Sequence, residues 1–80
     1  MVTAIVLMNV EGGQVARIAR EIGQIPDVTE VLSTAGAYDL VAKVQVQEYE
    51  HMSEVITERL QGVEGIINTE TLMAFHTYKF

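Results

Sequence analysis

Cysteine is absent from the 80-residue chain, and basic residues are few. Without cysteine the chain has neither a disulfide to stabilise a small fold nor the thiolate ligands of the usual structural zinc sites. Its two isolated histidines do not form a metal cluster, so we expect no metal and no cofactor. Only five residues are Lys or Arg, and they are scattered along the chain. Such scattering leaves no basic patch for nucleic-acid phosphates or an anionic membrane, so neither is an expected partner.

Long hydrophobic runs are also missing. Residues 1–8 are apolar but lack the basic start of a signal peptide and the length of a membrane span, so we expect a first strand and a cytoplasmic protein. Residues 1–80 make one domain, and a chain this short buries only roughly 60% of its unfolded surface. The hydrophobic fraction is 49% and the net charge is -6, so we expect the chain to be soluble but to have apolar surface to cover. Because it has no disulfide and no metal, oligomerisation is the remaining source of additional stability.

Hydrophobic spacing predicts six elements in the order βαββαβ. We expect strands over 2–10, 28–35, about 38–47 and 66–80, and helices from Val15 to near Gly23 and from Tyr49 to Leu60. This order is typical of a ferredoxin-like α+β fold, a four-stranded antiparallel sheet with two helices on one face. The first strand is apolar on both sides, so the uncovered face predicts a homodimer that forms through the sheets. The long last strand could reach a neighbouring subunit, and whether it is exchanged stays open.

The link between the two central strands contains Gly36, Ala37, Tyr38 and Asp39. Glycine permits the positive φ of a tight reversal, Asp39 could accept from an ammonium group, and N–H groups around Gly36 could donate to a carboxylate. A small zwitterion such as a free amino acid fits this set. A turn glycine followed by a strand-starting tyrosine and an edge-capping aspartate explains the same set more simply, without any ligand. Side chains of a strand alternate between its two faces, so this pattern places Tyr38 on the same face as Leu40 and Ala42.

Other candidate side chains lie in the second half of the chain. Thr69 and Thr71 alternate on the last strand, so both hydroxyls point the same way, toward a ligand or toward cross-strand partners. His51 and His76 could each act as a general base, but no spacing indicates an orienting acid. We therefore expect no catalytic residue.

Several segments together resemble one family. They are Ile-Pro-Asp-Val at 25–28 followed by Val31, Gly-Ala-Tyr-Asp-Leu-Val at 36–41, and Gly62-Val63 followed by Asn-Thr-Glu-Thr at 68–71. They resemble the ligand-sensing domain of the leucine-responsive/asparagine-responsive (Lrp/AsnC) regulators over nearly the whole chain. The resemblance implies a ferredoxin-like domain whose dimers assemble into rings and bind amino-acid effectors between dimers, near the hairpin. On matching positions it implies Gly36, Ala37, Tyr38 and Asp39 as ligand-binding residues, with Thr69 and Thr71.

One difference from the family affects the expected function. The regulators carry an N-terminal helix-turn-helix that reads DNA, whereas this sequence starts at its first strand and resembles the stand-alone members. We therefore expect a non-catalytic amino-acid sensing and oligomerisation domain that could modulate a full-length Lrp/AsnC-type regulator. Two alternatives stay open. One is a small dimeric α/β-barrel enzyme of the cofactor-free monooxygenase type, with His51 or His76 in a closed pocket, and the other is a purely structural interaction module.

Overall fold

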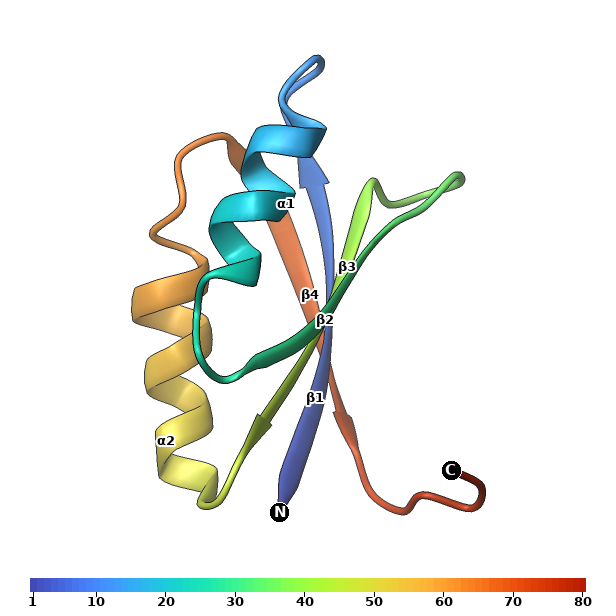
Figure 1. The fold of residues 1–80 in the computed structure, drawn as a ribbon, viewed down its shortest axis with the longest axis vertical. Coiled ribbons are helices and arrows are strands. Elements are labelled where there is room, and N and C mark those ends of the chain that lie inside the picture. Colours follow the sequence, from blue (N-terminus) through green and yellow to red (C-terminus); the bar gives the residue numbers. More distant parts are fainter.

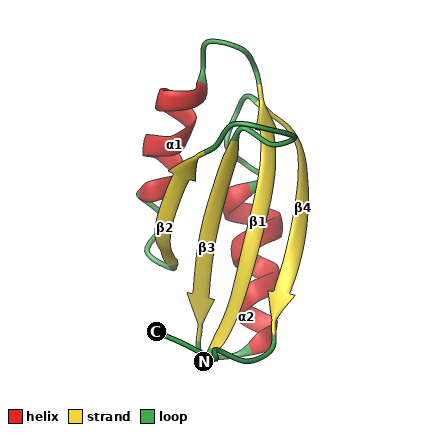
Figure 2. Cartoon of the chain, turned by 90° about the vertical axis from the view of Figure 1, so that its right-hand side faces the viewer, coloured by secondary structure: helices red, strands yellow, loops and turns green.

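The computed structural model describes residues 1–80 and confirms the predicted order of elements. The elements are β1 (Val2–Val10), α1 (Val15–Gly23), β2 (Val28–Ser33), β3 (Leu40–Val46), α2 (Tyr49–Glu54), the π-helical segment η1 (Val55–Leu60) and β4 (Ile66–Ala74). The four strands form one antiparallel sheet in the order β2-β3-β1-β4. Both helices cover the same face of this sheet (Figures 1 and 2). The ferredoxin-like fold is therefore confirmed.

Strand β1 lies in the middle of the sheet and is paired along both edges, with β3 and with β4. Its residues alternate between two faces, as strand geometry requires. Ala4, Val6 and Met8 face the helices and are fully buried. The core that they start is completed by residues of α1, β3, α2 and η1 and by Ile25 in the turn after α1. It contains 15 buried residues, all of them hydrophobic.

Three predicted strand ends are wrong, and each has a physical reason. The ladder between β2 and β3 stops at the pair Ser33 and Leu40, so β2 does not reach residue 35 and β3 does not begin at residue 38. The last strand pairs only with β1, and Ala74 lies opposite Thr3, next to the end of β1. Beyond Ala74 only Val2 of β1 remains as a possible partner, and residues 75–80 are not part of the sheet.

The second helix changes its geometry halfway. Its first part is α-helical, and from Val55 it continues as the wider π-helix η1. At its end the Gln61 N–H donates to the carbonyl of Ile56, five residues back, at 3.1 Å. Single turns of π-helix occur often at functional sites. Neither helical segment nor α1 is long and apolar enough to cross a lipid bilayer.

The face of the sheet away from the helices, called the open face below, carries apolar side chains on the edge strands β2 and β4 as well as on the central strand β1. Leu32 of β2 and Leu72 of β4 are 50% and 47% exposed there. Ile5 and Leu7 belong to β1, which lies between β2 and β4 in the sheet. In Figure 1 the C-terminal residues 75–80 also lie on this side, away from the helices. Phe75, Tyr78 and Phe80 of this tail are among the exposed large hydrophobic residues.

Gly65, just before β4, is one position where only glycine fits. Its φ is +103°, and a Cβ atom there would lie 2.7 Å from Cδ1 of Ile18 and 3.0 Å from Nη2 of Arg17. Ile18 is fully buried in the core, so it has little room to move aside. This contact ties the start of β4 to α1.

We expect Gly65→Ala to lower the free energy of unfolding by about 2 kcal/mol or more, because backbone strain and overlap in a packed core each cost about 1–3 kcal/mol. Urea unfolding followed by circular dichroism measures the change. Gly12→Ala is the matched control, since no atom lies within 4 Å of its Cβ position and an effect within about 0.5 kcal/mol is expected there. Equal stability of the two variants would contradict the role assigned to Gly65.

Candidate ligand site

The link between β2 and β3 projects from the open-face side of the sheet (Figure 1). Gly36 has a φ of +131°, which confirms the predicted positive φ. The link is closed by two hydrogen bonds from Thr34, whose hydroxyl donates to the carbonyl of Tyr38 at 2.7 Å and whose N–H donates to the carbonyl of Asp39 at 3.0 Å. The side chain of Asn9 in β1 donates to the carbonyl of Ala37 at 2.9 Å. The end of β1 therefore holds the link in place.

Asp39 is bound to β1 through both its backbone and its side chain. Its N–H donates to the carbonyl of Met8 at 2.9 Å, and its Oδ2 accepts the N–H of Val10 at 3.0 Å. The register between β1 and β4 shifts between Asn9 and Val10, and the carboxylate satisfies a backbone donor at this irregularity. Asp39 thus has a structural partner in the isolated subunit, and a carboxylate retains capacity to accept further hydrogen bonds.

Tyr38 points to the open face, and the prediction that it shares a face with Leu40 and Ala42 is wrong. Leu40 and Ala42 are fully buried under the helices. The Tyr38 hydroxyl instead donates to Oε1 of Glu70 on β4 at 2.6 Å, and Glu70 lies opposite Leu7 on the open face. The alternation of β3 begins only at Leu40, so it does not set the direction of Tyr38. The hydrogen bond to Glu70, slight desolvation and the Glu70 charge raise the pKa of Tyr38 above its ordinary value.

The two predicted threonines lie on the other face of the sheet, toward the second helix. Thr69 accepts a hydrogen bond from Nε2 of Gln61 at 3.1 Å, so its partner belongs to the turn after η1 and not to a neighbouring strand. Thr71 lines a pocket between β4 and the second helix. One subunit therefore does not bring the threonines together with the link at residues 36–39.

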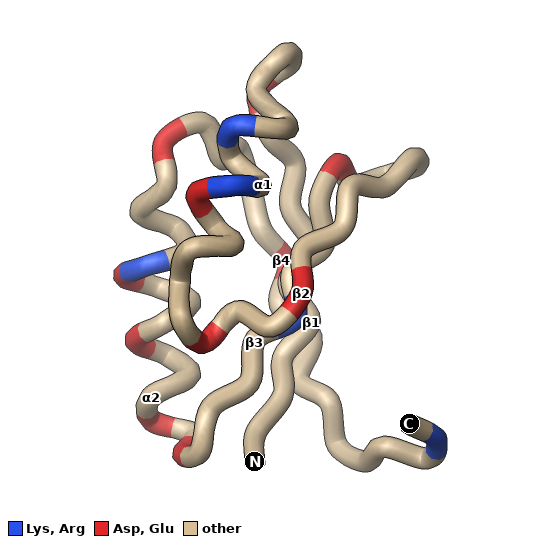
Figure 3. The backbone as a smooth tube through the Cα atoms, viewed as in Figure 1, with Lys and Arg blue, Asp and Glu red and all other residues tan.

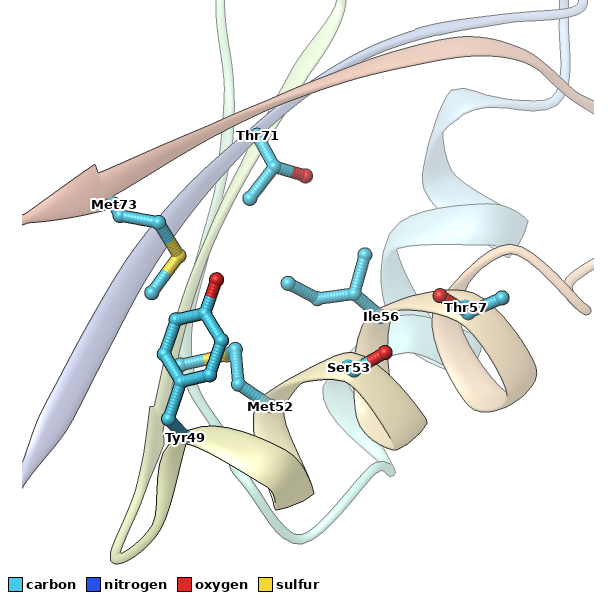
Figure 4. A pocket seen from close by; sticks show the side chains of 7 residues that line it. All are labelled: Tyr49, Met52, Ser53, Ile56, Thr57, Thr71 and Met73. Atoms are coloured by element: carbon cyan, nitrogen blue, oxygen red, sulfur yellow. The ribbon is translucent and has the colours of Figure 1, made fainter.

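The pocket has a volume of about 280 Å³ and lies where the edge strand β4 faces α2 and η1 (Figure 4). It is lined by Tyr49, Met52, Ser53, Ile56, Thr57, Thr71 and Met73. Sequence reasoning assigned only Thr71 to a ligand site and took the apolar helix positions as core. Met52 and Ile56 are indeed almost buried, at 2% and 9% exposure, whereas Tyr49 is 65% exposed. Tyr49 has the sequence spacing of a core residue but borders a pocket. Whether it does so depends on the distance between the helix and the edge strand, and hydrophobic periodicity gives no information about that distance.

The pocket is lined without any charged side chain. None of its seven lining residues is an aspartate, glutamate, lysine, arginine or histidine. Acidic residues follow the outer side of the second helix (Figure 3). The pocket is therefore a mixed apolar and hydroxyl surface.

Neither histidine lines the pocket. His51 is exposed on α2, with its Nε2 3.2 Å from Oδ2 of Asp27 and its Nδ1 3.6 Å from Oε2 of Glu54. The two carboxylates approach different ring nitrogens, so they do not converge on one metal position, and no group of three such residues could hold an ion. His76 lies in the exposed tail, in an edge-on contact with the ring of Tyr78.

Comparison with known proteins identifies relatives of this chain. The family model of the Lrp/AsnC ligand binding domain matches residues 3–80. The HTH-type transcriptional regulator FL11 of Pyrococcus horikoshii is 26% identical over 76 residues, which make up 95% of this chain and 50% of the regulator. The chain thus spans about half the length of the curated relatives it matches.

Two solved structures extend the comparison. The protein TTHA0845 of Thermus thermophilus is 40% identical, has a TM-score of 0.91, and each chain is covered completely by the other. The transcriptional regulator NMB0573 of Neisseria meningitidis, solved as a complex with L-methionine, is 15% identical with a TM-score of 0.87 over 99% of this chain and 53% of the regulator. At that identity the second likeness shows the fold alone.

The bond between Asp39 and Val10 predicts a stability effect. We expect Asp39→Ala to lower the free energy of unfolding by about 1–3 kcal/mol, because it leaves the Val10 N–H without an acceptor in a partly buried position. Asp39→Asn is the isosteric control, since its amide oxygen can still accept from Val10, and a smaller loss is expected. Thermal unfolding of both variants measures the difference, and equal losses would count against the backbone contact.

The hydrogen bond between Tyr38 and Glu70 leads to a prediction about the pKa of Tyr38. Its raised pKa in the folded protein means that the bond to Glu70 stabilises the fold at and below the ordinary tyrosine pKa of about 10, and that this stabilisation is lost as the pH rises through the folded-state pKa. Glu70→Ala should move the Tyr38 pKa back toward the ordinary value. Absorbance at 295 nm, taken as the difference from Tyr38→Phe, isolates this group from the other tyrosines. An unchanged titration in Glu70→Ala would refute the assigned cause.

Proposed function

We propose, on the premise that the chain belongs to the family of Lrp/AsnC ligand binding domains, that it is a non-catalytic sensor of amino acids. The effector would bind between subunits, and its binding would control their assembly. The observation that carries this proposal is the separation of the candidate residues within one subunit. The link at 36–39 lies on the open-face side, whereas Thr71 lines a pocket on the helix side.

A composite site reconciles these two positions. The link of one subunit meets the pocket beside β4 of a neighbouring subunit, so that each contributes half of the ligand contacts. In this arrangement N–H groups around Gly36 and Ala37 donate to the effector carboxylate, and Asp39 accepts from its ammonium group. Within the link, the Tyr38 hydroxyl donates to Glu70. Thr69 and Thr71 contribute hydroxyls from β4 on the other side of the composite site. The L-methionine complex of NMB0573 supports an amino acid as the ligand class.

Assembly requires a second contact, and the open face supplies a surface for it. Leu32 and Leu72 are about half exposed on this face, with Ile5 and Leu7 between their strands. Packing this face against the same face of a second copy buries them all and makes a two-fold dimer. Dimers that join through the composite sites form a ring. Full-length regulators of the family carry the same domain and are further proposed partners, and the proposed place of action is the cytoplasm, where such regulators act.

The mechanism follows from mass action. A ligand that binds only the assembled form stabilises it by RT ln(1 + [L]/Kd), which is about 2.7 kcal/mol when the free ligand is 100 times Kd. Such a shift changes the ratio of assembled to dissociated protein about a hundredfold. No conformational change within the subunit is required, because the site exists only between subunits.

A structural interaction module is the second candidate, and one observation favours it. Both Asp39 and Tyr38 already have hydrogen-bond partners within the chain, so the link could serve only to shape an interface. The enzyme alternative places His51 or His76 in a closed pocket, and the pocket beside β4 contains neither. No observation favours the enzyme.

Calorimetric titration with the twenty common amino acids tests the sensor directly. We expect at least one to bind, with assembly that increases in parallel by light scattering. Asp39→Asn keeps an acceptor for the Val10 N–H but removes the charge opposite the ammonium group, so its affinity should fall about tenfold or more, which corresponds to about 1.4 kcal/mol.

The control is the unfolding midpoint of Asp39→Asn, which must stay close to that of the original chain. Undiminished affinity in this variant would exclude Asp39 as the ammonium partner. Identical assembly with and without every amino acid would favour the structural module.

A further inference from the structure

We infer that the effector is an amino acid with an uncharged, largely apolar side chain, and that this side chain occupies the pocket beside β4. The inference rests on the proposed function, because it assigns the chemical class of the ligand at that same site. Its basis is the chemistry of the pocket wall and the size of the pocket.

The wall offers apolar contacts from both sides. Met73 on β4 faces Met52 and Ile56 on the helical side (Figure 4). The ring of Tyr49 closes one end of the pocket and is 65% exposed, so a guest side chain could cover it. Methionine side chains adapt to guests of different shape because they are unbranched and flexible. These contacts suit an aliphatic, thioether or aromatic side chain.

No charged group lines the pocket. A ligand ammonium, guanidinium or carboxylate placed there would lose hydration without gaining an opposite charge, which disfavours it strongly. The polar groups are hydroxyls of Tyr49, Ser53, Thr57 and Thr71. None of these four side chains donates or accepts a hydrogen bond within the chain. Free hydroxyls tolerate a neutral polar atom at the edge of an apolar guest.

The size of the pocket sets an upper limit on its occupant. Its volume of about 280 Å³ lies just under the range of roughly 300–1,000 Å³ that is usual for drug-sized ligands. This volume suits a single amino-acid side chain better than a nucleotide or a large cofactor. The amino and carboxylate groups then remain outside, where the link of the neighbouring subunit is proposed to bind them.

The test compares side-chain classes on the full chain. Leucine, methionine and phenylalanine form the apolar set, and lysine, arginine, aspartate and glutamate form the charged set, each titrated by calorimetry. We expect at least one apolar amino acid to bind at least tenfold more tightly than every charged one. Ser53→Asp introduces a carboxylate at the exposed rim of the pocket, so it should weaken the apolar ligand about tenfold and improve lysine relative to it. Gln24→Glu adds the same charge at the end of α1 and should change neither affinity.

The possible outcomes separate this inference from the proposed function. Tightest binding by a charged amino acid would overturn the inference and leave the sensor intact. The inference is equally overturned when an apolar amino acid binds but Ser53→Asp leaves its affinity unchanged, since the side chain then lies elsewhere. Binding of no amino acid at all would overturn the proposed function and this inference together.

Discussion

The double-sided apolar character of β1 is the constraint on which the rest of the structure depends. The strand is paired on both edges, so its side chains can only be covered from above and below the sheet. The helices cover Ala4, Val6 and Met8, which are fully buried. Ile5 and Leu7 lie on the open face, which the proposed dimer would cover. In a small chain without disulfides, burial of this face would add stability, and the proposed sensor would use that association as its output.

The far end of β1 also holds the candidate ligand link. Met8, Asn9 and Val10 bind it through a carbonyl, a side chain and an N–H respectively, and the contacts of Asn9 and Val10 join residues 28 and 29 positions apart in the sequence. The core strand and the link are therefore joined by three hydrogen bonds. A change in packing around β1 would displace Asp39, so stability and ligand recognition are expected to depend on each other at this point.

Strand β4 connects the two halves of the proposed composite site. Its alternation sends Glu70 to the open face, where Tyr38 binds it, and sends Thr69 and Thr71 toward the second helix. Adjacent residues of one edge strand thus contact both a link on one face and a pocket on the other. Strand geometry makes it impossible for a single subunit to direct these threonines and the Tyr38 contact to the same ligand. A site that uses both needs two subunits.

The sequence by itself determined the order of elements, the two faces of β1, the glycine turn and the family, because these depend on local periodicity and on residue types at fixed spacing. Only the tertiary structure decided where strands end, since Ala74 is the last residue with a partner on β1. It also decided the direction of Tyr38, the bond between Asp39 and Val10, and the pocket between the second helix and β4. Each of these features depends on contacts between residues far apart in the chain. The spacing of hydrophobic residues along the sequence gives no information about such contacts.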